Sequence, residues 1–270
     1  ALFGRLFPRG RGHNGKAHRL TGRAEHRPPV GADRVRRHQQ RARLLHQGTD
    51  TEIGKTAITA GLTHLAGSLG MRSSAVKPLA AGQDIVNNRW VNEDVLRLRA
   101  AANIELTDAQ VGPLQLRTPC APHIAAELEG ITIEPEALLA TVQRTLRLCD
   151  IGFVEGVGGF RVPLTAGWDT ADMAADLDLP VILVVGMRLG CINHALLTVE
   201  AVQARGLHLA GWVANAVDPS MAYVEDNLAA LSARLNAPCW GQVPRLPDPN
   251  PAAVAAHLSL SALRVALENA

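Results

Sequence analysis

The stretch Gly48-Thr49-Asp50-Thr51-Glu52-Ile53-Gly54-Lys55-Thr56 decides the fold of this chain. Its last three residues are typical of a loop that opens a helix, where free backbone N–H groups carry partial positive charge and bind phosphate. Lys55 would reach the β- and γ-phosphates of a nucleotide, and the Thr56 hydroxyl would bind Mg²⁺. Five residues, not the usual four, separate Gly48 from Gly54. The alternative interpretation is a glycine-capped strand-to-helix turn with an exposed lysine.

Segments typical of strands and of helices alternate after this loop. The pattern predicts strands over 72–79, 151–155, 180–185, 209–214 and 239–243, and helices over 56–67, 92–102, 122–129, 135–148, 192–204, 219–235 and 259–267. Strands separated by helices predict an α/β fold with a doubly wound, mostly parallel sheet, like that of the P-loop NTPases. Because neither a repeat nor a linker follows the loop, residues 47–270 are expected to form one domain.

The composition limits the class of protein. Of the 270 residues 47% are hydrophobic but only 3% are aromatic, so an aliphatic core is expected, as in sheets covered on both faces. The longest apolar run, 180–186, is far too short to cross a membrane. Four widely spaced cysteines without a Cys-x-x-Cys pair indicate reduced thiols in a cytoplasmic protein.

The amino-terminal segment, residues 1–46, differs from the rest. It carries 12 of the 27 Lys/Arg and 2 of the 25 Asp/Glu, so the remaining chain is acidic and nucleic-acid binding is not expected of it. We interpret this segment as disordered or aberrant, because it cannot bury enough apolar surface to offset its ordering entropy. Three origins stay open: a basic tail for an anionic partner, an organellar transit peptide, and sequence read out of frame up to about Gln47. Resequencing the gene upstream of Gly48 would decide whether the segment is read out of frame.

Two further charged side chains stand at predicted strand ends. Glu155 ends an apolar strand and opens the glycine-rich turn 156–159, and Lys77 ends the strand before Pro78. Carboxyl ends of parallel strands meet at the edge where nucleotides bind, so Glu155 is a candidate Mg²⁺ ligand and Lys77 a candidate phosphate ligand. Taken singly, each is equally an ordinary solvated charge.

Five segments together resemble the dethiobiotin synthetases. They are 48–56, Val-Lys-Pro-Leu-Ala-Ala-Gly (76–82), Val-Glu-Gly-Val-Gly-Gly (154–159), Leu-Gly-Cys-Ile-Asn-His-Ala (189–195) and Gly-Trp-Val-Ala-Asn (211–215). The resemblance covers residues 48 to about 250, in the family's order and spacing, and the five-residue gap inside the loop is the family's own form.

The resemblance implies that ATP, CO₂ and 7,8-diaminononanoate give dethiobiotin, ADP and phosphate through a carbamate that ATP phosphorylates. It implies Lys55 and Lys77 as catalytic cations and Thr56, Asp94 and Glu155 as Mg²⁺ ligands, with Glu93 as the local rival of Asp94. The ATP-binding residues that it implies are Glu52, Ile53, Gly54, Lys55, Thr56, Ala57, Asp94, Glu155, Gly156, Val157, Gly158, Asn215, Ala216, Pro244, Arg245 and Leu246.

The resemblance also implies a substrate site and a partner. The substrate-binding residues are Thr51, Ala81, Leu189, Gly190, Cys191, Ile192 and Asn193. The N–H groups of the helix start at 189–193 would hold the carboxylate of the diamine acid, in the family from the partner subunit of a homodimer. Family members often have Ser or Thr where Ala81 stands, so one substrate hydrogen bond is missing or comes from another group. They also have an acidic or polar residue where Ala216 stands.

Other interpretations remain. A partition-type ATPase would carry a second lysine early in the loop, where Thr49, Asp50 and Thr51 stand, and a cobyrinic acid amide synthase would need a glutaminase domain. A catalytically impaired or non-catalytic binding protein is the third alternative, because residues 41–47 make a poor central strand in front of the loop.

Overall fold

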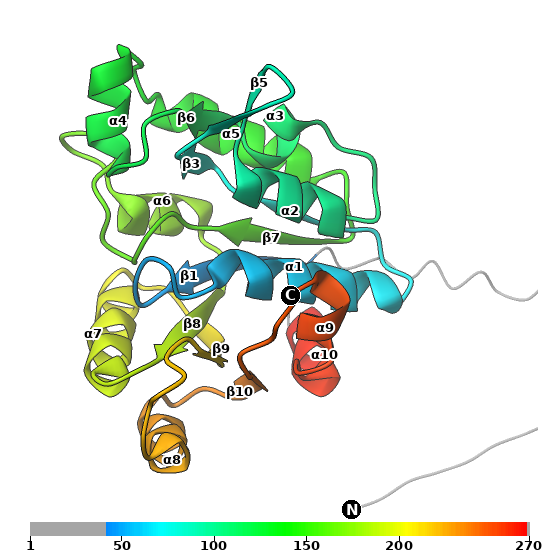
Figure 1. Cartoon of the computed structure of the whole chain (residues 1–270), viewed down its shortest axis with the longest axis vertical. Helices are drawn as coiled ribbons and strands as arrows, with labels where there is room; N and C mark the ends of the chain where they lie inside the picture. The colour runs from blue at the N-terminus through cyan, green and yellow to red at the C-terminus, as the bar shows by residue number, and fades with distance from the viewer. Residues whose placement is uncertain (1–41, 269–270) are drawn as a thin grey trace, which may run out of the picture. The chain divides into compact units, whose positions relative to one another are not determined.

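The computed structural model describes residues 42–268, and six strands of this part form one sheet (Figure 1). Their order is β10-β9-β8-β1-β7-β2, and every neighbouring pair is parallel. The strands are β1 (Ala42–Gly48), β2 (Ser73–Val76), β7 (Ile151–Glu155), β8 (Val181–Met187), β9 (Leu209–Ala216) and β10 (Cys239–Val243). The predicted doubly wound α/β sheet is therefore confirmed, with β1 in its middle.

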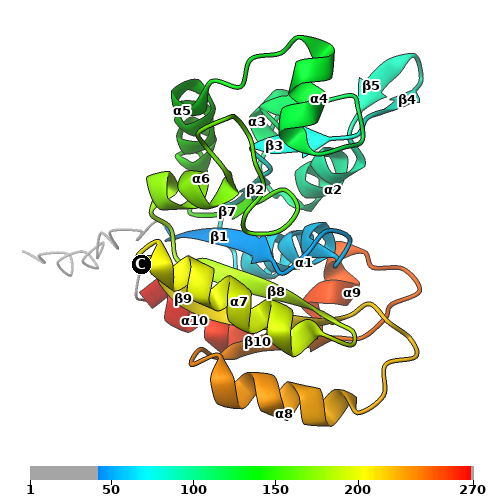
Figure 2. The same cartoon turned by 90° about the vertical axis from the view of Figure 1, so that its left-hand side faces the viewer.

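Helices cover both faces of the sheet (Figures 1 and 2). One core lies under α1 (Lys55–Ser68), α2 (Glu93–Ala101), α3 (Asp108–Val111), α9 (Pro251–Ala255) and α10 (Leu260–Glu268). The other lies under α4 (Pro122–Glu129), α5 (Pro135–Leu146), α6 (Thr170–Leu177), α7 (Cys191–Ala204) and α8 (Val224–Arg234). Successive strand residues alternate between them, so Leu44 packs in the first core and Leu45 in the second.

The strand order changes direction at β1, and this change locates the candidate site. The chain runs from β1 to β2 on one side of it and from β7 across to β8 on the other. Ligands of open α/β sheets bind at the carboxyl edge beside such a switch point. The loop after β1, with the start of α1 at Lys55, occupies this position.

β1 forms although two of its buried side chains are polar. His46 and Gln47 are fully buried. Nδ1 of His46 bonds Oγ1 of Thr59 at 2.7 Å, but its Nε2 and both amide atoms of Gln47 have no hydrogen-bond partner among the described residues. Leu44 and Leu45 supply the apolar contacts of the strand. The prediction that residues 1–46 are disordered or aberrant is therefore wrong for 42–46, which belong to the central strand, and the rest of that segment lies outside the described residues.

The structure differs from the predicted elements in several places, and the helices α3, α6 and α9 are among the elements that were not predicted. The predicted strand 72–79 is two strands, β2 and β3 (Leu79–Ala81), separated at Lys77-Pro78, because proline has no N–H to donate to the ladder. The predicted helix 219–235 begins only at Val224. The strand β6 (Leu114–Leu116), which pairs with β3, and the hairpin of β4 (Asp84–Val86) and β5 (Arg89–Val91) were not predicted.

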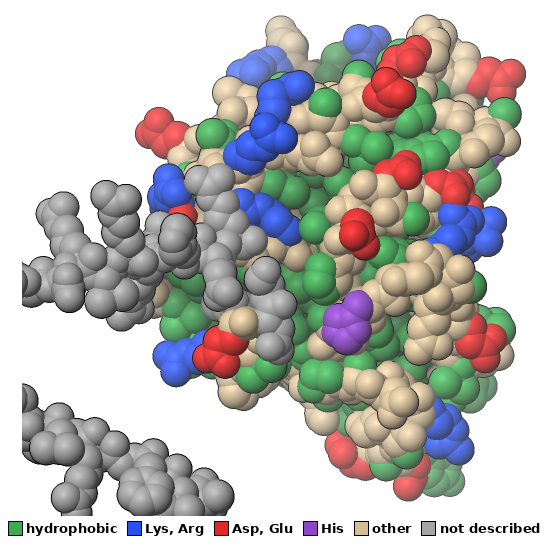
Figure 3. Space-filling view, turned by 180° about the vertical axis from the view of Figure 1, so that it is seen from behind, with side chains coloured by type: hydrophobic (Ala, Val, Ile, Leu, Met, Phe, Trp, Pro, Cys, Tyr) green, Lys and Arg blue, Asp and Glu red, His purple; other side chains and the backbone are tan. Residues whose placement is uncertain are grey.

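No helix among the described residues is both long and apolar enough to cross a bilayer. On the face seen in Figure 3, Lys/Arg and Asp/Glu side chains are interspersed rather than gathered into one basic patch.

Candidate functional site

The phosphate loop is built around Gly48 and Gly54. A Cβ on Gly48 would lie 2.7 Å from Cδ of Lys55, so the lysine stem needs this glycine to pass. Gly54 has φ +82°, and a Cβ there would lie 2.3 Å from Nδ2 of Asn215. That amide donates to the carbonyl of Ile53 at 2.8 Å and ties the loop to β9. Nζ of Lys55 donates to the carbonyl of Asp50 at 2.6 Å, inside the curve of the loop.

Four predicted residues meet beside this loop. Nζ of Lys77 donates to Oε1 of Glu155 at 2.8 Å and also pairs with Oδ2 of Asp94. The Thr56 hydroxyl donates to the same Oε1 at 2.6 Å. Because β2 and β7 are neighbours that end at the same edge, residues 78 positions apart come into contact. The sequence-predicted cluster of Thr56, Lys77, Asp94 and Glu155 is thus brought together.

The charges of this cluster influence one another. Burial acts to lower the pKa of Lys77, but the carboxylates of Glu155 and Asp94 outweigh it and hold that pKa above its usual value. Burial acts to raise the pKa of Asp94, yet the ammonium of Lys77 keeps it below its usual value. Lys77 and Asp94 are therefore a charged pair at neutral pH.

Lys55 behaves differently. Burial lowers its pKa to about 8, an effect that the carboxylate of Glu155 opposes and the ammonium of Lys77 reinforces. The lysine therefore begins to lose its charge just above neutral pH. Burial, helped by the charge of Lys55, lowers the pKa of His46 to about 3, so this imidazole stays neutral behind the loop.

The donor set fits Mg²⁺. Oε2 of Glu155 is fully buried without a hydrogen-bond partner, beside the Thr56 hydroxyl and near the carboxylate of Asp94. Within residues 42–268 no three His, Cys, Asp or Glu side chains gather around one point. Mg²⁺ in nucleotide enzymes commonly takes one or two carboxylates and completes its shell with water and substrate phosphate. The carboxylates of Glu155 and Asp94 and the hydroxyl of Thr56 match this preference.

A hollow of about 330 Å³ continues from the loop toward β9 and β10. The predicted ATP-binding residues that line it are Glu52, Gly54, Ala57, Asn215, Ala216, Pro244, Arg245 and Leu246. The apolar side chains of Ile58, Val243 and Val254 add a wall suited to a flat base. Eight predicted residues from three separate segments thus share one pocket.

The remaining predicted residues lie around the same edge. The turn after β7 with Gly156, Val157 and Gly158 runs against the phosphate loop, since a Cβ on Gly158 would lie 3.5 Å from Oγ1 of Thr51. Ile53 is buried under the loop. Ala81 ends β3, and the next residue, Gly82, lines a hollow of about 250 Å³ together with Asp94.

The predicted substrate helix start follows β8. Gly190 precedes α7 in a left-handed conformation with no side-chain cap, Cys191 is buried, and Ile192 is half-buried. Leu189 is 94% exposed and Asn193 is also exposed. Uncapped N–H groups in such a turn are free for an anion.

Asp50 and Arg188, which no sequence pattern singled out, form an ion pair between the loops after β1 and β8. Arg97, also not predicted, lines the hollow of about 330 Å³. Arg97 follows Asp94 by one helical turn on α2, and this spacing is a signal that would have found it.

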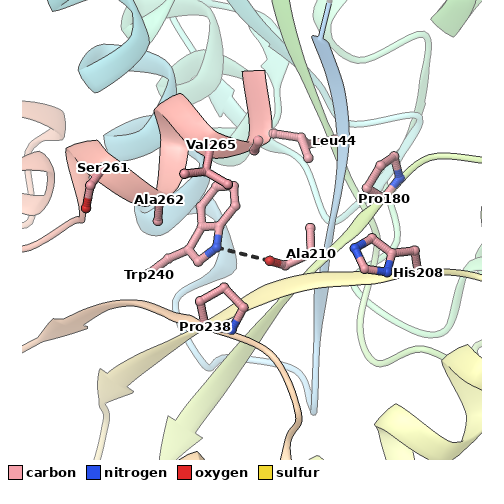
Figure 4. A pocket seen from close by; sticks show the side chains of 10 residues that line it. Leu44, Pro180, His208, Ala210, Pro238, Trp240, Ser261, Ala262 and Val265 are labelled. Carbon is pink, nitrogen blue, oxygen red and sulfur yellow. Dashed lines mark hydrogen bonds between the residues drawn. The ribbon is translucent and has the colours of Figure 1, made fainter. Parts of the chain in front are cut away.

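A third hollow, of about 280 Å³, contains none of these residues (Figure 4). Leu44, Pro180, Ala210 and Trp240 line it, and Nε1 of Trp240 donates to the carbonyl of Ala210 at 3.2 Å. The hollow of about 330 Å³, by contrast, adjoins the phosphate loop, because Glu52 and Gly54 of the loop line it.

Comparison with known proteins shows the family of the chain. A family model described as "AAA domain" matches residues 43–253. A protein of Aromatoleum aromaticum named ATP-dependent dethiobiotin synthetase BioD is 52% identical over 213 residues, 79% of this chain and 95% of that protein. Proteins with the same name from a Janthinobacterium species and from Pseudomonas paraeruginosa are 50% and 51% identical, over 80% and 82% of this chain and 93% and 97% of theirs. The chain therefore belongs to the family of ATP-dependent dethiobiotin synthetases.

Proposed function

We propose that this chain makes dethiobiotin from 7,8-diaminononanoate, CO₂ and ATP. One amine of the diamine adds to CO₂ and loses a proton, which gives a carbamate. The carbamate oxygen attacks the γ-phosphorus of ATP and releases ADP. The second amine then attacks the carbonyl carbon of this mixed anhydride, expels phosphate, loses a proton and closes the cyclic urea. The observation that carries the proposal is the contact of Lys77 with Glu155 and Asp94 beside Lys55 and Thr56.

Positive charge and position are what this reaction needs from the protein. Lys55, which bonds the Asp50 carbonyl, lies where a phosphate would replace that carbonyl as its partner. Lys77 keeps its charge because its pKa is raised, so it can stabilise the carbamate and its phosphorylated form. Burial of both ammonium groups strengthens these interactions, because water screens them less.

Thr56, Asp94 and Glu155 would hold Mg²⁺. Bound there, the ion would neutralise phosphate charge during transfer. Lys77 now spans the two carboxylates, so the proposal requires its ammonium to turn toward the carbamate and leave them to the metal.

The diamine acid would be held at both ends. The hollow beside Ala81 is lined by Asp84, Glu93 and Asp94, whose carboxylates suit ammonium groups. The uncapped start of α7 suits the carboxylate. In a homodimer this helix start would come from the partner subunit. The four free thiols fit a cytoplasmic enzyme.

The test is formation of dethiobiotin by the purified chain with ATP, Mg²⁺, bicarbonate and diamine, each omitted in turn. Lys77→Met and Lys55→Met are expected to lower kcat/KM at least 100-fold, about 3 kcal/mol of transition-state stabilisation. Arg99→Gln is the control, because Arg99 pairs with Asp108 on the surface at 2.6 Å. The assignment would be refuted if both lysine variants formed dethiobiotin at the rate of the intact chain.

An impaired enzyme is the second candidate, and β1 is the observation behind it. The unpaired polar atoms of His46 and Gln47 lie directly before the phosphate loop and cost stability there. If the intact chain is inert, replacing residues 1–47 by a short apolar strand should restore activity. Failure of that replacement would favour a non-catalytic binding protein.

A further inference from the structure

Asp50 is a junction within the phosphate loop. Its carbonyl accepts from Nζ of Lys55 at 2.6 Å, and its Oδ1 accepts from the backbone N–H of Thr51 at 2.7 Å. Its Oδ2 pairs with the guanidinium of Arg188. The conformation of one residue is therefore fixed by the candidate catalytic lysine on one side and by a distant loop on the other.

Arg188 is equally placed between two elements. It follows the last residue of β8 and precedes the start of α7. Its carbonyl accepts from the N–H of Cys191 at 3.0 Å, which shapes the turn that opens α7. The preceding carbonyl, of Met187, accepts from the N–H of Asp218 at 3.3 Å and anchors this turn to the loop after β9. Arg188 thus contacts Asp50 through its side chain and the first turn of α7 through its carbonyl.

From these contacts we infer that Arg188 is a positioning residue that links the phosphate loop, through Asp50, to the first turn of α7. The inference rests on the proposed function, in which ATP binds the loop and this turn binds the carboxylate of the diamine acid at the partner subunit's site, so the link joins the two sites of a homodimer. Lys55 must exchange the Asp50 carbonyl for phosphate when ATP binds, so the Asp50 backbone loses a partner while its carboxylate still holds Arg188. Binding at one site therefore changes the other, and the coupling is reciprocal.

Arg188 and Asp50 are each 41% exposed, which limits the size of the effect. Solvent screens such a pair, and the interaction of half-exposed charges corresponds to about a two- to fivefold change in a binding constant. We expect a non-hydrolysable ATP analogue with Mg²⁺ to bind the intact chain two- to fivefold more tightly when 7,8-diaminononanoate is present. The ratio of the two dissociation constants, measured by calorimetry, is the readout.

The variants separate positioning from folding. Arg188→Gln and Asp50→Asn should each bring the ratio close to one, and the double variant should do no more, because both residues act through one contact. Arg188→Lys keeps the charge and should keep part of the coupling. Arg99→Gln removes a surface pair of similar exposure, 45% and 33%, and should leave the ratio of the intact chain.

A ratio of one in the intact chain, or an unchanged ratio in Arg188→Gln, would overturn the inference. The dethiobiotin assay distinguishes this from failure of the proposed function. An intact chain that forms dethiobiotin without coupling refutes the link alone, whereas an intact chain that binds neither ligand refutes both.

Discussion

Gln47 gives the sharpest prediction about stability. Its side chain is fully buried in the central strand, and both amide atoms lack a partner among the described residues. An unpaired buried amide costs about 1–3 kcal/mol by mutational measurements. Methionine has nearly the same shape without the amide, and its flexible chain can adapt to the tight space against Gly156. The space is tight because a Cβ added to Gly156 would lie only 2.2 Å from Oε1 of Gln47. Gln47→Met is therefore expected to raise the free energy of unfolding by about 1–3 kcal/mol.

Urea denaturation of both proteins, followed by far-UV circular dichroism, measures this difference. A gain of 1 kcal/mol raises Tm by about 2–4 °C in a chain of this size. Gln143→Met is the matched control, because Gln143 is exposed on α5 and its replacement should change stability by less than about 0.5 kcal/mol. A loss of stability in Gln47→Met at an unchanged m-value would show that the amide is paired in solution and that the reasoning is wrong.

Three further outcomes are expected. Lys55 has a pKa of about 8, so its ammonium loses its proton as pH rises through that value. Because phosphate binds the charged ammonium, the Kd of ATP measured by calorimetry should rise about eightfold between pH 7.5 and 9. Lys55→Met should show no such rise. Gly54→Ala forces a left-handed alanine against Asn215 and should weaken ATP binding at least tenfold by calorimetry, while equal binding would contradict the close approach. Asp94→Asn should lower kcat at least tenfold and raise the Mg²⁺ concentration for half-maximal rate, whereas Glu93→Gln should do neither; the reverse order of effects in a Mg²⁺ titration would exchange their roles.

Much of the architecture was predictable because it depends on local patterns. The loop 48–56 fixes a strand before it and a helix after it, and buried aliphatic strands alternate with helices along the rest of the chain. Lys77 and Glu155 were predictable as neighbours because parallel strands end at one edge, whichever two strands they follow. The hairpin of β4 and β5 was missed although Asn87 and Asn88, with φ of 51° and 59°, form the two-residue turn that asparagine favours.

Other features leave no local pattern. Asp50 and Arg188 are 138 residues apart, and only the adjacency of β1 and β8 brings their loops together. Pro78 marks the break in the strand expected over 72–79, but the pairing of β3 with β6 beyond the break is another tertiary contact. The strand at 42–48 has two polar residues at positions that are buried on both faces, so its place in the sheet is set by its neighbours rather than by its own propensity.

The central place of β1 also determines when the site can form during synthesis. β1 pairs with β7 and β8 alone, so its first partners are made about 100 residues after it and the last about 140 residues after it. At about 5–20 residues per second, the nascent strand waits roughly 5–30 s before its partners have been synthesised. Chains truncated before β8 should therefore have a loop that proteases cleave readily and that ATP does not protect, whereas chains extending through β10 should resist cleavage. For that interval the strand that carries the candidate phosphate loop has no partner in the sheet.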